Sequence, residues 1–426
     1  MKAPEERAVL VGAPTPEVSP EEADEHLEEL GRLADTAGAT VVAVLIQRLD
    51  APHPRYFIGE GKARQLKRVV GERGATVVVF DDELTPAQGK NLEDLLGTRV
   101  MDRTELILDI FATRARTNEA QLQVELAQLE YLLPRLKRMW THLSRIRGGI
   151  GLRGPGETQL ETDRRIISRR ISDLRQKLHV VARRRATQRK GRSGEFQAAL
   201  VGYTNAGKSS LLRALSGTEL FVEDRLFATL DPATRQVELP MGSRVLVTDT
   251  VGFIRKLPHH LVASFRATLE EASEADVLLH VIDGSHPRWE EQKHVVEDVL
   301  RELDLDEIPV ALVFNKVDQL THDEEDALRA RSRAMFAAPV VLSSAVERNG
   351  LKELLHFLED QIRLQRPEVQ VLIPAADGES LATVYREGEV ISREERGTVI
   401  DLRARLPQPT LGRLRQREGI EIHGAA

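Results

Sequence analysis

Gly202-Tyr203-Thr204-Asn205-Ala206-Gly207-Lys208-Ser209 is the stretch that decides how the central part of the chain folds. Two glycines separated by four residues and followed by Lys-Ser form the P-loop pattern. The apolar run 198–201 before it predicts a buried strand, and residues 209–215 after it predict a helix. A glycine loop between a strand and a helix turns backbone N–H groups toward phosphate. The sequence therefore predicts a phosphate-binding loop, because a chance glycine turn would not explain the Lys-Ser ending.

Strands and helices alternate after this loop. The predicted strands are 198–201, 236–239, 244–248, 277–282, 310–314 and 340–342. Several are continuous apolar runs, which is typical of parallel strands covered on both faces. Ligands of such sheets bind at the carboxyl ends of the strands. The pattern predicts an α/β domain with a mostly parallel sheet over residues 193–366.

Two polar motifs follow strands of this sheet. Asp249-Thr250-Val251-Gly252 follows strand 244–248, where Asp249 can hold Mg²⁺ through water and the Gly252 N–H can meet a γ-phosphate. Asn315-Lys316-Val317-Asp318 follows strand 310–314. The Asp318 carboxylate can accept two hydrogen bonds from guanine, whereas adenine has no such donor pair. We therefore predict a site for GTP or GDP, in which Asn315 braces the loops, Lys316 covers the base and Ser343-Ser344-Ala345 meets guanine O6.

The loop 226–235 can complete a metal site. A Thr there can close on Mg²⁺ and the γ-phosphate and so distinguish GTP from GDP. Thr229 and Thr234 both qualify, and we favour Thr229. Lys208, Thr229 and Gly252 are the predicted catalytic residues, and Ser209, Thr229 and Asp249 are the predicted Mg²⁺ ligands. The predicted nucleotide-binding residues are Gly202, Tyr203, Thr204, Asn205, Ala206, Gly207, Lys208, Ser209, Ser210, Phe227, Ala228, Thr229, Leu230, Asp231, Asp249, Thr250, Val251, Gly252, Asn315, Lys316, Val317, Asp318, Ser343, Ser344 and Ala345.

Phe253 occupies the position after Asp-x-x-Gly where many GTPases have the Gln that orients the attacking water. A phenylalanine cannot orient water by hydrogen bonding, and the sequence shows no obvious arginine finger. We expect slow intrinsic hydrolysis, with the water positioned by the backbone, another side chain or a partner.

The first 112 residues predict a small α/β domain. Apolar runs at 7–12, 41–46 and 76–81 read as strands, and Ser19-Pro20-Glu21-Glu22 has the form of a helix start. A further helix is predicted at 63–73. Gly59-x-Gly61-Lys62 is either a contact to phosphate or RNA or the turn that begins this helix, and two glycines alone favour the turn.

Residues 113–192 predict an antiparallel helical hairpin. Apolar residues recur in steps of four and three at Leu122, Leu126, Leu129, Leu133 and Leu136, and again at Ile167, Ile171, Leu174, Leu178 and Val181. This spacing is a coiled-coil seam, which Pro134 should kink or interrupt. The connector 145–156 holds five glycines and a proline, so it is a flexible tip or a disordered linker.

The hairpin is also the basic part of an acidic protein. Residues 131–192 hold eighteen Lys/Arg and four Asp/Glu, which gives +14 for this stretch and −21 for the rest of a chain whose net charge is −7. Arg145, Arg147 and Arg153 cluster at the tip without an acid and are the candidate RNA contacts. A solvated helical face is the alternative explanation of the charge. Residues 367–426 predict a small α/β appendix in which we find no chemistry.

Four strings resemble the HflX family of translation-factor-related P-loop GTPases. They are the P-loop, Phe227 to Arg235, Tyr56 to Lys62, and Gly148 to Glu161, and the resemblance covers roughly residues 1–365. It implies a Mg²⁺-dependent GTPase that binds the large ribosomal subunit. The N-terminal domain and the hairpin would reach toward the peptidyl-transferase region, and the protein would split or rescue stalled ribosomes under stress. Some members also hydrolyse ATP.

Composition narrows the remaining possibilities. The chain has no cysteine, which excludes disulfides and thiolate metal sites, and no apolar stretch long enough to span a membrane. We expect a cytoplasmic monomer that is in part ribosome-associated. The alternatives are a regulatory switch that binds a protein effector through the hairpin and an ATP- or GTP-dependent RNA remodeller.

Overall fold

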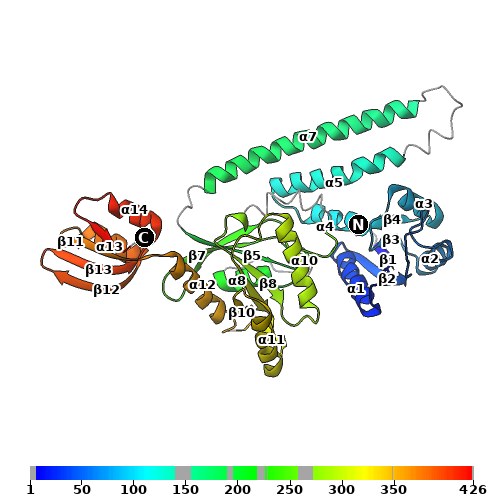
Figure 1. Ribbon diagram of the computed structural model, residues 1–426. Helices are drawn as coiled ribbons and strands as arrows, with labels where there is room; N and C mark the ends of the chain where they lie inside the picture. Colours follow the sequence, from blue (N-terminus) through cyan, green and yellow to red (C-terminus); the bar gives the residue numbers. More distant parts are fainter. Residues whose placement is uncertain are drawn as a thin grey trace.

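The computed structural model describes residues 6–139, 155–189, 195–217, 226–227, 229–257, 272–347 and 349–424. These residues form three separate β-sheets and a long helical hairpin. The sheet that carries the P-loop lies in the middle, with the N-terminal and C-terminal domains at opposite ends (Figure 1). The mixed α/β fold class expected from the sequence is confirmed.

The N-terminal domain is a four-stranded parallel sheet in the order β2-β1-β3-β4. Helices α1 and α4 pack on one face, and α2 and α3 pack on the other. The Gly59-x-Gly61 turn begins a helix, with Gly59 as the N-cap of α2. The elements are β1 (Glu6–Gly12), α1 (Pro20–Thr36), β2 (Ala39–Ile46), α2 (Glu60–Arg73), β3 (Val77–Phe80), α3 (Pro86–Leu96), β4 (Arg99–Asp102) and α4 (Arg103–Arg114).

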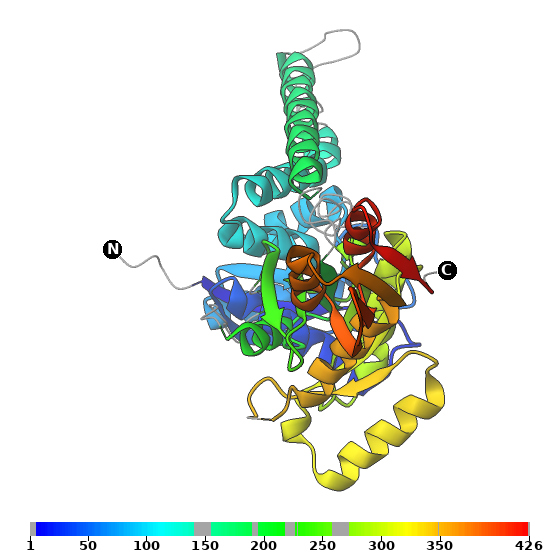
Figure 2. The same ribbon diagram turned by 90° about the vertical axis from the view of Figure 1, so that its left-hand side faces the viewer.

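The hairpin consists of α5 (Asn118–Met139) and α7 (Pro155–Arg189), which lie side by side in both views (Figures 1 and 2). Leu126, Ile171 and Leu174 are buried between them, with the neighbouring seam residues packed around. Eight of the ten predicted seam residues belong to this cluster, and the other two, Leu136 and Val181, do not. The helix α5 continues through Pro134 to Met139, so the proline does not end it. The candidate RNA contacts Arg145, Arg147 and Arg153 lie outside the described residues.

The central sheet has the order β10-β9-β8-β5-β7-β6, and it is parallel except for the edge strand β6. All six predicted strands are present. The helix α10 covers one face, and α8 and α12 cover the other. The elements are β5 (Phe196–Gly202), α8 (Lys208–Ser216), β6 (Ala233–Glu238), β7 (Arg244–Asp249), β8 (Val277–Asp283), α10 (Trp289–Glu302), β9 (Val310–Asn315), η2 (Val317–Gln319), α11 (His322–Met335), β10 (Val340–Leu342) and α12 (Lys352–Gln365).

The C-terminal domain is a four-stranded antiparallel sheet in the order β12-β13-β11-β14. Its β-α-β-β-α-β element order is that of the ferredoxin-like fold. An apolar cluster joins its strands to both helices. The elements are β11 (Glu368–Pro374), α13 (Gly378–Glu387), β12 (Glu389–Arg396), β13 (Val399–Arg405), α14 (Gln408–Arg415) and β14 (Glu421–His423).

Candidate nucleotide-binding site

The P-loop runs from the end of β5 to the start of α8, as the sequence predicts. Two of its glycines lie too close to neighbouring atoms for any side chain. A Cβ on Gly202 would lie 2.2 Å from the carbonyl oxygen of Val281, and a Cβ on Gly207 would lie 2.2 Å from Asn315 Nδ2. Gly207 also has a φ of 95°. The glycines therefore allow the loop to close tightly against β8 and the end of β9.

Lys208 is buried at the centre of the loop. Its Nζ donates hydrogen bonds to the carbonyl oxygens of Gly202 at 3.0 Å and Tyr203 at 2.9 Å. Burial lowers the pKa of Lys208 to about 8, although the nearby Asp249 opposes the shift. The side chain is thus pre-oriented by its own loop at the position where a phosphate would be met.

Ser209, Thr229 and Asp249 come together beside this lysine. Ser209 Oγ lies 2.6 Å from Thr229 Oγ1 and donates to Asp249 Oδ2 at 2.6 Å. Asp249 is 2% exposed, and its Oδ1 is buried with no hydrogen-bond partner among the described residues. Carboxylate and hydroxyl oxygens are the donor set that Mg²⁺ prefers, and an orphaned carboxylate oxygen needs a partner. These three residues therefore fit the metal that the sequence predicts.

The two candidate threonines are placed differently. Thr229 belongs to the oxygen cluster just described. Thr234 lies in β6, where its Oγ1 is 2.9 Å from Thr248 Oγ1 on the neighbouring strand. The geometry favours Thr229 over Thr234. Ala228 lies outside the described residues.

The Asn315 loop is joined to the P-loop. Asn315 Nδ2 donates to the carbonyl oxygen of Ala206 at 2.9 Å, which is the bracing role expected of it. Ser344 Oγ donates to Asp318 Oδ1 at 2.6 Å, so the serine motif after β10 contacts the carboxylate that was predicted to bind guanine. Ser343 is buried, and its N–H donates to the carbonyl oxygen of Phe314 at 2.8 Å, which fixes that motif against β9.

Asp283 is a member of this site that sequence reasoning missed. Its carboxylate accepts a hydrogen bond from Lys316 Nζ at 2.7 Å, and Lys316 itself has a φ of 63°. The signal was available, because Asp283 ends β8 at the same carboxyl edge as the other motifs.

The Asp249-Thr250-Val251-Gly252 motif lies against the P-loop. A Cβ on Gly252 would lie 2.7 Å from Thr204 Cα and 3.0 Å from Lys208 Nζ, so only glycine fits there. The Phe253 N–H donates to the carbonyl oxygen of Gly202 at 3.1 Å, and the Thr204 N–H donates to that of Phe253 at 2.6 Å. The Phe253 side chain is fully buried in the apolar core. Phe253 therefore fixes the backbone of this segment to the P-loop, and its buried apolar side chain offers no polar group near Lys208.

The segment from Leu226 to Asp231 was predicted to bind nucleotide. In the structure Phe227 contacts the N-terminal domain, and Asp231 contacts the residues just before α5. Phe227 is 2% exposed and packs edge-on against Phe111 of α4, with ring centroids 4.6 Å apart. The Asp231 carboxylate accepts hydrogen bonds from the backbone N–H groups of Arg116 at 3.2 Å and Thr117 at 3.3 Å. Leu230 is buried in the same apolar cluster as Phe227.

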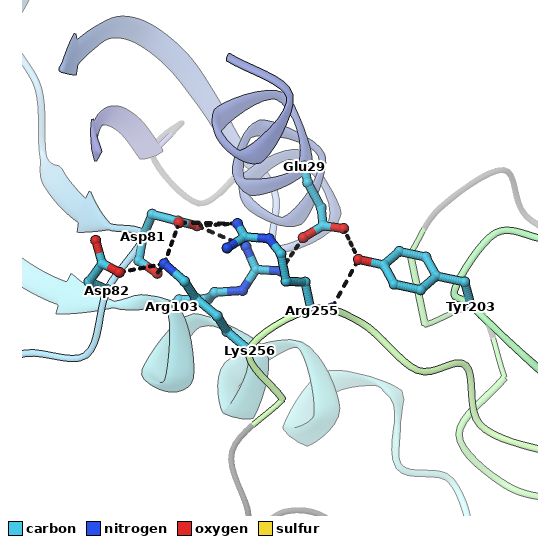
Figure 3. A network of polar contacts seen from close by, with 7 residues as sticks. All are labelled: Glu29, Asp81, Asp82, Arg103, Tyr203, Arg255 and Lys256. Carbon is cyan, nitrogen blue, oxygen red and sulfur yellow. Dashed lines mark hydrogen bonds and ion pairs between the residues drawn. The ribbon is translucent and has the colours of Figure 1, made fainter. Parts of the chain in front are cut away.

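A polar network that the sequence did not predict joins the N-terminal domain to both the P-loop and the segment after Gly252 (Figure 3). Asp81 accepts from Arg103 at 2.9 Å, Arg255 at 3.1 Å and Lys256 at 2.9 Å. Burial alone would raise the pKa of Asp81, but these three cations outweigh it and hold the pKa below its ordinary value. Glu29 pairs with Arg103 and accepts a hydrogen bond from the Tyr203 hydroxyl, and Asp82 pairs with Lys256.

Asn315 joins the loop 315–318 to the P-loop, so the two loops form one site, and this combination of motifs is that of a P-loop GTPase. Residues 24–112 match the family described as GTP-binding GTPase N-terminal, and residues 114–192 match GTP-binding GTPase Middle Region. Residues 197–316 match the family described as 50S ribosome-binding GTPase. The chain belongs to the HflX GTPase family.

Relatives with that name align along nearly the whole chain. The GTPase HflX of Magnetococcus marinus is 44% identical over 423 residues, covering 98% of this chain and 97% of the relative. That of Alkalihalophilus pseudofirmus is 50% identical over 390 residues, covering 90% and 89%. That of Escherichia coli is 44% identical over 401 residues, covering 92% of each. The crystal structure of the SsGBP and GDP complex is 26% identical with a TM-score of 0.48, and the match covers 83% of this chain and 98% of that one.

Helices in the described part of the chain are too short or too polar to cross a bilayer.

Proposed function

We propose that this protein hydrolyses GTP to GDP and phosphate on the large ribosomal subunit and uses the cycle to split or rescue stalled ribosomes under stress. The observation that carries the hydrolytic part is the convergence of Lys208 with the Ser209–Thr229–Asp249 oxygen cluster. The ribosomal part is supported by family membership and by the description of the family that matches residues 197–316.

Each group at the site has a role in this proposal. Lys208 places its ammonium on the β- and γ-phosphates, and the Gly252 N–H meets the γ-phosphate. Ser209, Thr229 and Asp249 hold Mg²⁺, which neutralises charge on the phosphates. Asp318, braced by Ser344, reads guanine, and Lys316 covers the base. Replacing Asp318 with Asn should shift the preference from guanine to xanthine nucleotides, which a binding competition would measure.

The buried Phe253 makes this chain a slow GTPase on its own. The buried phenylalanine side chain cannot orient water, so we expect the ribosome to stimulate turnover. The test is GTP turnover of the purified protein with and without large ribosomal subunits. Turnover above ~1 s⁻¹ by the isolated protein, within the ordinary enzyme range, would contradict this expectation.

The hairpin is proposed to contact ribosomal RNA. The helix α7 exposes Arg164, Arg165 and Arg169, whereas the seam between α5 and α7 is already filled. Because the seam is filled, little apolar surface is left on it to bind a coiled-coil effector. Exposed arginines can form ion pairs with RNA phosphates. Binding to large subunits should therefore weaken steeply with salt, whereas a protein effector bound through apolar contacts should respond much less.

We propose a division into an N-terminal domain (1–112), the basic hairpin (113–192), the GTPase domain (193–366) and a C-terminal domain (367–426). In this proposal the protein is a cytoplasmic monomer, part of which is bound to ribosomes. Sedimentation with and without large subunits would test both the monomer and the association.

A further inference from the structure

Tyr203 is the second residue of the P-loop, yet its side chain extends toward the N-terminal domain (Figure 3). Its hydroxyl donates a hydrogen bond to the Glu29 carboxylate of α1 and accepts one from the backbone N–H of Arg255 at 2.9 Å. The ring is 7% exposed. One buried hydroxyl therefore links the P-loop, the N-terminal domain and the segment after Gly252.

The direction of these two hydrogen bonds is fixed by chemistry. Burial, together with the charge of Glu29, raises the pKa of the Tyr203 hydroxyl far above its ordinary value, so the phenol keeps its proton. The hydroxyl therefore donates its hydrogen bond to the Glu29 carboxylate, which only accepts. The lone pairs of the hydroxyl oxygen accept the hydrogen bond from the Arg255 N–H. Glu29 is held in turn by Arg103, which is 2% exposed and also bonds to Asp81. The N-terminal domain thus sets the orientation of the Tyr203 hydroxyl.

The bond to Arg255 acts on the stretch of backbone that hydrolysis needs. Phe253 is already paired with Gly202 and Thr204 by two backbone hydrogen bonds, and Arg255 lies two residues further on. Together the three bonds hold residues 252–255 along the P-loop, with Gly252 against Lys208. Because the Phe253 side chain cannot orient water, the position of this backbone is one means of ordering the γ-phosphate and its attacking water.

We propose that Tyr203 and Glu29 are positioning residues for GTP hydrolysis: Glu29 orients the Tyr203 hydroxyl, which holds the backbone at Arg255 and so keeps the Gly252 N–H at the γ-phosphate. The inference rests on the proposed GTP hydrolysis and adds to it a contribution of the N-terminal domain to the hydrolytic site. We expect GDP affinity to depend little on this link, because the Tyr203 hydroxyl contacts Glu29 and Arg255. The side chains proposed to bind the phosphates and the base are Lys208, Asp318 and Lys316.

Simple docking of the two domains is the competing explanation, and α1 offers a matched control for it. Glu25 lies one turn before Glu29 on the same helix and binds Arg288 at 2.9 Å and His286 at 3.4 Å, just before α10. Glu25 therefore also fastens the N-terminal domain to the GTPase domain. Among the described residues, Glu25 makes no hydrogen bond or ion pair with Tyr203 or with residues 252–257. A loss of docking alone should therefore appear equally in a Glu25 variant.

The experiment measures single-turnover GTP hydrolysis and GDP affinity of the full chain, alone and with large ribosomal subunits. The variants are Tyr203→Phe, Glu29→Leu, Glu29→Gln and Glu25→Gln. We expect Tyr203→Phe and Glu29→Leu to lower the rate about tenfold or more, with GDP affinity within about twofold of wild type, since small misplacements near the reacting groups have effects of this size. Glu29→Gln should recover most of the rate, because its amide oxygen still accepts from Tyr203. Glu25→Gln should hydrolyse GTP like the wild type.

Tyr203→Phe is the decisive variant, because Glu29→Leu leaves Arg103 buried with only part of its partners. An unchanged or faster rate for Tyr203→Phe would overturn the proposal. So would a Glu25→Gln protein as slow as Tyr203→Phe, since docking would then explain both. A wild type that binds GDP but hydrolyses no GTP, with or without subunits, would instead overturn the proposed function.

Discussion

Gly202 occupies a position of the P-loop where no side chain fits. Its absent Cβ would overlap the Val281 carbonyl oxygen at 2.2 Å, and that backbone atom belongs to a central strand that cannot move cheaply. We expect Gly202→Ala to destabilise the GTPase domain by about 2–4 kcal/mol and to weaken GDP binding. The control is Gly89→Ala in α3, where a Cβ meets nothing within 4 Å and the change should stabilise by about 0.5–1 kcal/mol. Thermal unfolding with and without GDP measures both, and equal behaviour of the two variants would contradict the prediction.

We expect the buried His280 to make the stability of the GTPase domain sensitive to acid. It is fully buried on β8 facing Lys293 of α10 and Lys208, and burial with these two ammonium groups lowers its pKa from 6.5 to about 3. As the pH falls below 6.5, His280 becomes protonated in the unfolded chain but stays neutral in the folded chain. The free energy of unfolding therefore decreases between pH 6.5 and about 3, by up to about 1.4 kcal/mol per pH unit. The apparent Tm of His280→Leu should fall less between pH 7 and pH 5 than that of the wild type. The exposed His356→Leu variant is the reference. If the Tm of His280→Leu falls as much as that of the wild type, His280 is not the origin of the acid sensitivity.

Among individual residues, the sequence predicts those that belong to motifs with a fixed spacing. Lys208, Ser209, Asp249, Asn315 and Asp318 each belong to a short motif after a strand, and parallel strands bring such motifs to one edge. The link between Glu29 and Tyr203 spans 174 residues and depends on how two domains dock. No local pattern encodes that docking, so the network of Figure 3 had to come from the structure.

The helix α7 is joined to α5 by a narrow apolar seam and by the exposed ion pairs Arg170–Glu125 and Arg175–Glu130. Leu174 is fully buried between α5 and α7, whereas Ile166 on the same helix is 58% exposed. We expect Leu174→Ala to cost about 2–5 kcal/mol and to loosen the hairpin, and Ile166→Ala to cost little. Hydrogen exchange of α7 is the measurement, with GDP affinity unchanged because the seam lies apart from the P-loop. Equal exchange in the two variants would show that the seam does not hold the hairpin.

Long periodic elements are predictable from sequence, and short or tertiary-dependent ones are not. The seam of the hairpin and the strands β5, β7, β8 and β9 were found because their apolar patterns are long or strongly buried. The four-residue strand β4 carries too little pattern for that. The helix α5 passes Pro134 because tertiary contacts hold its far side, where Arg135 bonds to Asp102 at 3.1 Å and to the Leu84 carbonyl oxygen at 3.3 Å. Such contacts override a local helix breaker.

At the scale of the whole molecule, the N-terminal domain and the hairpin hold both loops that flank the γ-phosphate position. One apolar cluster runs from the N-terminal domain into the GTPase domain, with Phe111 against Phe227 at the join. On the other side, Arg255 and Lys256 pair with Asp81. GTPase loops of this kind rearrange when the γ-phosphate is lost. Under the proposed function, we expect a change of nucleotide to strain or move these contacts, which would give a physical route from the site to the hairpin.

Asp231 is the residue through which that route meets the hairpin. Its carboxylate accepts from the N–H groups of Arg116 and Thr117, immediately before α5 begins at Asn118, where negative charge stabilises a helix start. Under the proposed function, Asp231→Ala should reduce the difference in large-subunit affinity between the GTP-analogue and GDP forms by about fivefold, with GDP affinity unchanged. Glu238→Ala, which removes an exposed carboxylate further along β6, is the matched control. A weakened GDP affinity would instead indicate that Asp231 binds the nucleotide, as its sequence motif predicts. If the difference in large-subunit affinity between the two nucleotide forms were unchanged, the hairpin would be coupled through the contacts of Asp81.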